Sequence, residues 1–134
     1  MTSLPTSLPA LRFAPLRGGP VLRWGIIAPG NIASQFATGL RRHTDQRITA
    51  VASRSPERAA AFASEFAIDR VHTSYEALVA DPEVDIVYVA SPHTSHREHA
   101  LLAIAAGKHV LVEKPIGISA AEAREVSAAA TAAG

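Results

Sequence analysis

One lysine of this chain has the surroundings of a catalytic group. Lys114 follows the apolar run 109–112 and stands between Glu113 and Pro115. Such a run predicts a buried strand, so Lys114 falls at a strand's carboxyl end, where open α/β sheets bind ligands. A lysine held there beside a carboxylate and a chain-stiffening proline can donate a proton or a hydrogen bond to a substrate oxygen. An exposed lysine that merely ends a strand is the alternative.

A second candidate is the turn 28–33, which joins an apolar run to a helical pattern. It matches part of the dinucleotide fingerprint, because Gly30 takes the middle glycine's place, where a pyrophosphate can approach a helix amino terminus. Ala33 fits the third position, whereas Ala28 replaces the first glycine and predicts a strained or altered turn. A plain tight turn is the alternative. The candidate cofactor contacts here are Ala28, Pro29, Gly30, Asn31 and Ile32.

The pair Ser53-Arg54 ends the next apolar run, about twenty residues later. An acidic residue at this place binds the adenosine ribose of NAD, whereas an arginine and a hydroxyl accommodate the 2′-phosphate of NADP. We therefore predict NADP as the cofactor. NAD stays open because Arg54 can also stack on an adenine, and an ordinary exposed arginine is the remaining alternative.

A fourth turn, Ser91-Pro92-His93, follows the nearly continuous apolar run 85–90. Proline lacks an N–H and fixes the chain direction, which suits a wall beside a nicotinamide ribose. We also expect His96 to cap or line this turn. The candidate cofactor contacts in this region are Ser91, Pro92, His93 and His96.

Histidines recur every three residues at positions 93, 96 and 99. Steps of three residues rotate steadily around a helix, and Glu98 is the one carboxylate nearby. We therefore predict no metal site and expect His99 and His109 to be structural.

Short apolar runs alternate with helical patterns from Leu22 onward, which predicts βαβ units and a parallel sheet. Three helix starts carry capping signals, at Ser55-Pro56, at Thr73 with Glu76, and at Ser119 with Glu122. Because parallel strands share a direction, the four candidate turns open along one edge. The expected strands are 22–28, 47–52, 68–72, 85–90 and 110–113, and the expected helices are 31–41, 56–66, 73–80, 95–106 and 119–134.

Composition narrows the class of protein. The 134 residues are 48% hydrophobic and 19% charged with a formal net charge of +1, which argues against disorder and against a nucleic-acid surface. No apolar run is long enough for a membrane span, and the absence of cysteine excludes disulfides. The first twenty residues hold four prolines and no signal-peptide core. We expect a flexible leader at 1–20, one domain at 21–134 and a cytoplasmic protein.

Several segments together carry a family resemblance, namely 23–33, 52–54, 90–93, His96 and 107–115. Their order and spacing resemble the Gfo/Idh/MocA oxidoreductases, the relatives of glucose-fructose oxidoreductase and inositol dehydrogenase. The resemblance implies an α/β Rossmann fold with a doubly wound parallel sheet in strand order 3-2-1-4-5. It also implies NADP or NAD as cofactor and hydride transfer between nicotinamide and a sugar, polyol or dihydrodiol.

The resemblance also implies roles for two residues of the last turn. The lysine matching Lys114 meets the substrate hydroxyl and the nicotinamide ribose, so Lys114 is the expected catalytic residue. The residue matching Glu113 supports the cofactor site. His93 departs from the family, since asparagine is common in its place.

Family members continue into a C-terminal α/β domain that binds the substrate, and we expect this chain to lack it. Catalysis by the chain alone is therefore left open. The alternatives are a non-catalytic dinucleotide-binding or assembly module and a truncated fragment. The substrate and the oligomeric state, including a homo-oligomer, also stay open.

Overall fold

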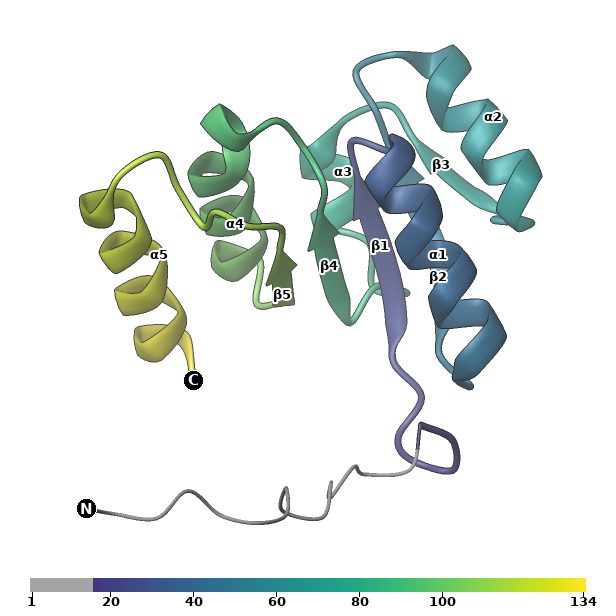
Figure 1. Ribbon diagram of the computed structural model, residues 1–134, viewed down its shortest axis with the longest axis horizontal. Helices are drawn as coiled ribbons and strands as arrows, with labels where there is room; N and C mark the ends of the chain where they lie inside the picture. Colours follow the sequence, from purple (N-terminus) through teal and green to yellow (C-terminus); the bar gives the residue numbers. More distant parts are fainter. Residues whose placement is uncertain (1–15) are drawn as a thin grey trace, which may run out of the picture.

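The computed structural model describes residues 16–134 as a five-stranded parallel sheet with helices on both faces (Figure 1). The neighbours in the sheet follow the order β3-β2-β1-β4-β5, and every pair is parallel. This arrangement confirms the predicted doubly wound Rossmann fold. The strands are β1 (Arg23–Ile27), β2 (Arg47–Ala52), β3 (Arg70–His72), β4 (Ile86–Val89) and β5 (His109–Val112).

Two helices cover one face of the sheet and two cover the other, while the last helix lies beside its predecessor (Figure 1). The first face carries α1 and α2, and the second carries α3 and α4. A short 3₁₀ turn, His93–Ser95, leads into α4. The helices are α1 (Asn31–His43), α2 (Pro56–Phe66), α3 (Tyr75–Val79), α4 (His96–Ala105) and α5 (Ala120–Ala133).

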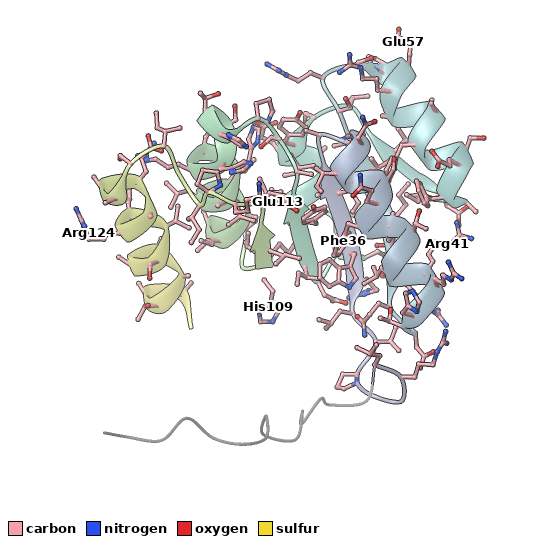
Figure 2. The ribbon with its side chains drawn as sticks, in the orientation of Figure 1. Phe36, Arg41, Glu57, His109, Glu113 and Arg124 are labelled. Carbon is pink, nitrogen blue, oxygen red and sulfur yellow. The ribbon has the colours of Figure 1, made fainter. Side chains whose placement is uncertain are left out.

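The core is divided by the sheet because successive strand residues point to opposite faces. Ile26 packs among the aromatic and alanine side chains of α1 and α2, and Ile27 packs against α3 and α4. Phe36 of α1, labelled in Figure 2, stacks on Tyr88 of β4, and the ring centroids are 4.1 Å apart. A Cβ on Gly25 would lie 2.8 Å from a methyl group of Leu78, so glycine lets α3 approach β1 closely.

The helix starts follow the capping signals with one exception. The Ser55 hydroxyl accepts the Arg58 N–H, and the Ser119 hydroxyl accepts the Glu122 N–H, both as predicted. The start predicted at Thr73 is wrong by one residue, because the cap of α3 is Ser74, whose hydroxyl accepts the Ala77 N–H at 3.0 Å. A serine in extended backbone directly before the helix supplies the same oxygen one position later.

Part of the predicted leader, residues 1–15, lies outside the described residues. The segment that follows contacts the domain: Arg17 pairs with Asp45 at 2.8 Å, and the Gln46 amide donates to the Pro20 carbonyl. The boundary at residue 20 stays a prediction. No helix within residues 16–134 combines the length and apolar character needed to span a bilayer.

Candidate functional site

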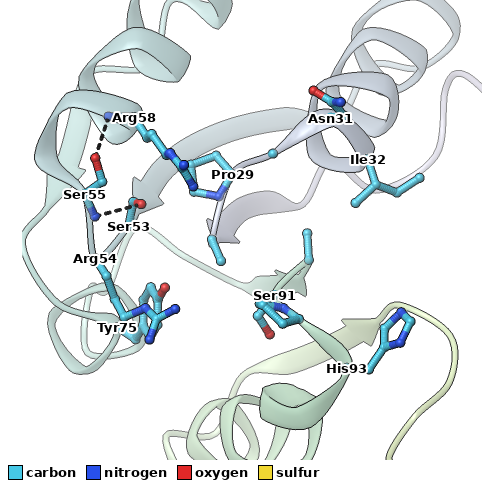
Figure 3. Close-up of a pocket in the computed structure, with 14 residues that line it drawn as sticks. Pro29, Asn31, Ile32, Ser53, Arg54, Ser55, Arg58, Tyr75, Ser91 and His93 are labelled. Carbon is cyan, nitrogen blue, oxygen red and sulfur yellow. Dashed lines mark hydrogen bonds between the residues drawn. The ribbon is translucent and has the colours of Figure 1, made fainter.

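A cleft of about 620 Å³ opens at the carboxyl edge of the sheet, where the turns after β1, β2 and β4 meet (Figure 3). Three turns that are far apart in the sequence therefore contribute to one surface. The predicted site residues that line it are Ala28, Pro29, Gly30, Asn31, Ile32, Ser53, Arg54, Ser91, Pro92 and His93.

The first turn is strained at Ala28 and open at Gly30. Ala28 has φ of 59°, in the left-handed region that favours glycine, which is the altered turn expected where alanine replaces the first glycine. Gly30 is the N-cap of α1 and has extended backbone, with φ of −150°. A Cβ at Gly30 would meet no atom within 4 Å, and no side chain caps the helix there. The amino terminus of α1 is thus open toward the cleft, where its N–H groups and dipole favour an anion.

The second turn adds two arginines to the cleft. Arg54 and Arg58 both line it, both are exposed, and neither forms an ion pair within the described part of the chain. Figure 3 shows Arg54 near Tyr75, while Arg58 extends toward Pro29. Two unpaired guanidinium groups beside a helix amino terminus make this end of the cleft suited to phosphate groups.

The turn after β4 is supported by a buried histidine of α4. Ser91 is buried, and its hydroxyl lies 2.9 Å from Nδ1 of His99, whose ring meets the Tyr75 ring edge-on at 4.6 Å. Burial lowers the pKa of His99 below its ordinary value against the opposing charge of Glu98, so the ring is neutral at pH 7. His99 therefore supports the cleft wall through neutral contacts.

A smaller hollow of about 330 Å³ adjoins the cleft and shares Arg54, Tyr75 and Ser91 with it. Glu76, Glu98 and His99 line its far side. Arg54 therefore lies where the two compartments meet, with an aromatic ring at hand for a flat group such as a purine.

The remaining predicted residues, His96, Glu113 and Lys114, do not line the cleft. Lys114 is exposed and follows β5, and its peptide bond to Pro115 is cis. The phenol of Tyr88 donates to Oε1 of Glu113 at 2.5 Å. His96 is fully buried and contacts carbonyl groups of the turns after β4 and β5. Glu113 and Lys114 thus follow β5 at the same edge of the sheet as the cleft, and His96 joins the turns after β4 and β5.

The three regularly spaced histidines differ in exposure, although the rings of His93 and His96 meet edge-on with centroids 5.4 Å apart. His93 is exposed at the cleft, whereas His96 and His99 are buried and contact backbone carbonyl and hydroxyl oxygens respectively. Their side chains are engaged in organising turns, in keeping with the structural role expected of His99.

Sequence reasoning missed Ser55, Arg58, Tyr75 and Ala90 in the cleft lining. Arg58 could have been found, because Ser55-Pro56 already predicted the start of α2 and placed Arg58 in its first turn. Tyr75 carries no motif, since it reaches the cleft from the other face of the sheet at the start of α3. Its contribution depends on how α3 packs.

Comparison with known proteins gives a consistent result. A family model described as an oxidoreductase family with an NAD-binding Rossmann fold matches residues 22–134. The chain is 46% identical over 111 residues to trans-1,2-dihydrobenzene-1,2-diol dehydrogenase of Mus musculus, covering 81% of this chain and 33% of the relative. It is also 46% identical over 112 residues to 1,5-anhydro-D-fructose reductase of Ensifer adhaerens, covering 84% and 34%. The chain thus spans about one third of the length of these curated relatives.

Solved structures show the same likeness. The 3-ketoreductase KijD10 from Actinomadura kijaniata, solved with NADP and TDP-benzene, superposes with a TM-score of 0.80 at 34% identity, over 85% of this chain and 35% of that one. Biliverdin reductase from Synechocystis, solved with biliverdin and NADP+, superposes with a TM-score of 0.77 at 30% identity, over 84% and 35%.

Proposed function

Because the chain belongs to the Gfo/Idh/MocA oxidoreductase family, we propose that its cleft binds NADP(H) and that Lys114 assists hydride transfer to or from a sugar, polyol or dihydrodiol. The family membership makes this an NAD(P)-binding Rossmann domain. The preference for NADP, the site residues and the reaction are the proposal.

The observation that carries the proposal is the open space above Gly30. The fold itself does not require glycine at this position, because its backbone is extended and a Cβ would meet nothing within 4 Å. A bound pyrophosphate would need that space in order to reach the amino terminus of α1. Gly30 thus forms a cradle that fits the cofactor.

The two arginines of the second turn support a preference for NADP. Arg54 follows β2 directly, where a 2′-phosphate is accommodated in Rossmann folds, and Arg58 lies one helical turn further on. Among the described residues that line the cleft, none is acidic, so none can receive the ribose hydroxyl groups of NAD instead. Two guanidinium groups without carboxylate partners favour the more negatively charged cofactor.

Lys114 would act as the general acid or base of the reaction. When bound, the nicotinamide would supply or accept the hydride of the reaction. Nζ of Lys114 would donate a proton to the substrate carbonyl oxygen in the reducing direction and take the proton of the hydroxyl group in the oxidising direction. The first compounds to assay are trans-1,2-dihydrobenzene-1,2-diol and 1,5-anhydro-D-fructose, because the two relatives are named for acting on them.

The cofactor preference is tested by replacing Arg54 with alanine. In a fluorescence titration, Arg54→Ala should weaken NADPH binding about 10-fold to 100-fold, because a charge-assisted phosphate contact contributes about 1.5–3 kcal/mol. NADH binding should change by less than about threefold, since NADH lacks the 2′-phosphate.

Arg124 of α5 provides the matched control, because it is exposed and lies far from the cleft (Figure 2). Arg124→Ala should leave both affinities unchanged. Equal losses of NADPH and NADH in Arg54→Ala would reject the 2′-phosphate role. Failure of the unaltered chain to bind either cofactor at millimolar concentration would reject the proposal as a whole.

A further inference from the structure

The turn that carries Lys114 is held by buried side chains, although Lys114 itself is exposed. The Lys114 ammonium makes no hydrogen bond within residues 16–134, but its backbone N–H donates to Oε2 of Glu113 at 3.2 Å. The Glu113 N–H in turn donates to the Val89 carbonyl at 3.1 Å and continues the β4–β5 ladder by one residue. The backbone beside Lys114 is therefore fixed while its side chain is left free.

Tyr88 fixes the Glu113 carboxylate from inside the core. Only 1% of Tyr88 is exposed, its ring is stacked on Phe36, and its hydroxyl donates to Oε1 of Glu113 at 2.5 Å. Burial raises the pKa of Tyr88, and the Glu113 hydrogen bond raises it further, so the phenol remains a donor. One oxygen of Glu113 thus binds Tyr88 and the other binds the Lys114 N–H, so rotation of the carboxylate would break both bonds.

His96 fixes the other side of the same turn. Its Nδ1 lies 2.6 Å from the Pro115 carbonyl oxygen, and its Nε2 lies 2.7 Å from the Ser91 carbonyl oxygen. A neutral imidazole donates one of these two bonds, and the protonated ring donates both. In either form the ring lies between the turn after β4, which lines the cleft, and the turn after β5, which carries Lys114.

We propose that Tyr88 and His96 are positioning residues that hold the backbone on both sides of Lys114 and so aim its ammonium at the end of the cleft lined by Pro92 and His93, where the nicotinamide would lie. This inference rests on the proposed function of Lys114. If Tyr88 served the core alone, any buried acceptor would satisfy its hydroxyl. Its acceptor is instead the residue directly before Lys114, and the oxygen beside it is bound by the Lys114 N–H. A displacement of about 1 Å at such a group can cost roughly 100-fold in rate.

The lysine content of the chain allows a direct test, because Lys108 and Lys114 are its two lysines. Reductive methylation with ¹³C-formaldehyde labels both lysines and the terminal α-amine, and Lys114→Arg identifies the Lys114 signal in a ¹³C–¹H spectrum. Lys108 serves as an internal reference, since its ammonium binds the carbonyls of Asp81 and Val84 at the opposite edge of the sheet. NADPH should shift the Lys114 signal of the unaltered chain and leave the Lys108 signal in place.

Tyr88→Phe removes the hydroxyl and keeps the ring. In this variant NADPH should bind with a Kd within about twofold of the original, while the NADPH-induced shift of the Lys114 signal falls by at least half. Glu113→Gln should give the same loss, and the double variant should lose no more than Glu113→Gln alone, because Tyr88 acts through Glu113. His96→Asn should also reduce the shift.

Phe36→Leu is the matched control, because it removes the ring stacked on Tyr88 and leaves the hydroxyl bond to Glu113 intact. It should lower stability and retain the full Lys114 shift. A full shift in Tyr88→Phe would overturn the positioning role. If NADPH binds the unaltered chain and no Lys114 shift follows, the proposed role of Lys114 is itself wrong, which is a different result.

Discussion

Gly30 separates what the fold requires from what a ligand requires. Its backbone is extended, as any residue can adopt, and the space beyond its Cα is empty. Serine at this position would keep an N-cap and could improve it. The fold therefore tolerates a side chain at position 30, whereas a bound pyrophosphate would leave no room for one.

Gly30→Ser should accordingly separate binding from stability. The free energy of unfolding without ligand should stay within about 0.5 kcal/mol of the original, because the new side chain enters open space. The Kd for NADPH should rise at least about tenfold, because that side chain occupies the place of the pyrophosphate. Urea denaturation and fluorescence titration measure the two quantities.

Gly39→Ser is the control for this variant. Gly39 also has open space around it, and it lies within α1 away from the cleft lining. It should leave NADPH affinity unchanged and stabilise the helix slightly, since serine costs less than glycine inside a helix. An unchanged Kd in Gly30→Ser would show that no phosphate approaches this turn.

Individual residues could be predicted where a motif sets both their type and their place in a turn. Gly30 and Arg54 belong to turns whose flanking strand and helix are visible in the sequence, and both line the cleft. Tyr75 could not be predicted, because its position depends on packing between elements. The same holds for the contact between Tyr88 and Glu113, which sequence spacing does not reveal.

Between elements, the start of the joint between β1 and β4 is held by Arg23, which pairs with Asp85 and also with Glu83 at 3.0 Å. Arg23 begins β1 and binds both carboxylate oxygens of Asp85, at 2.9 Å through Nε and at 2.6 Å through Nη2. Its backbone N–H also binds Asp85 at 2.8 Å. The Arg23 side chain, followed by its backbone N–H, lowers the pKa of Asp85 to about 2 from 3.8.

Asp85→Asn should therefore destabilise the domain in a pH-dependent way. A lowered pKa means that the folded state binds a proton less readily than the unfolded state, so the contribution is complete above about pH 4 and is lost as the pH falls to about 2. At pH 7 the cost should be about 1–2 kcal/mol, after a discount because 29% of the Asp85 side chain is exposed. Urea denaturation from pH 7 down to about pH 2 measures it.

Asp69→Asn is the control, since Asp69 is exposed and its carboxylate forms no ion pair within residues 16–134. It should change stability by less than about 0.5 kcal/mol at every pH. A pH-independent cost in Asp85→Asn would contradict the linkage argument, because it would mean that the charge of Asp85 is not what stabilises the joint.

Elements with strong periodic signals were predicted closely, and short ones were not. The caps at Ser55 and Ser119 begin long helices whose apolar spacing agrees with the capping residue. The helix α3 has only five residues, which is too short for its apolar spacing to decide between a cap at Thr73 and a cap at Ser74. The strand β3 is likewise only three residues long, and its length depends on pairing with β2.

Across the described domain, the candidate cleft and the Arg23–Asp85 ion pair occupy opposite edges of the sheet. The cleft lies at the carboxyl edge, whereas the Arg23–Asp85 pair and the Lys108 ammonium lie at the amino edge. The five residues of β1 rise about 3.3 Å each, so the edges are well beyond the roughly 7–10 Å within which substitutions couple. The shared edge followed from the strand-and-helix alternation, because parallel strands point the same way, whereas the strand order was implied by the family resemblance.

The double variant with Arg54→Ala and Asp85→Asn tests this separation. It should have the NADPH affinity of Arg54→Ala and the unfolding free energy of Asp85→Asn, each within about 0.5 kcal/mol, because sites this distant contribute additively. Titration and denaturation of the two single variants and the double variant measure the coupling. A coupling above about 1 kcal/mol would mean that the two edges communicate through the sheet.

The contacts of Arg17 with Asp45 and of Pro20 with Gln46 also indicate where a label or a surface can be attached to the domain. These contacts hold the start of the described chain near the entrance to β2, at the edge opposite the cleft (Figure 1). A fluorescent reporter or surface linkage attached at residue 16 itself would approach the domain from that side. Attachment at this position should therefore leave the mouth of the cleft facing solution.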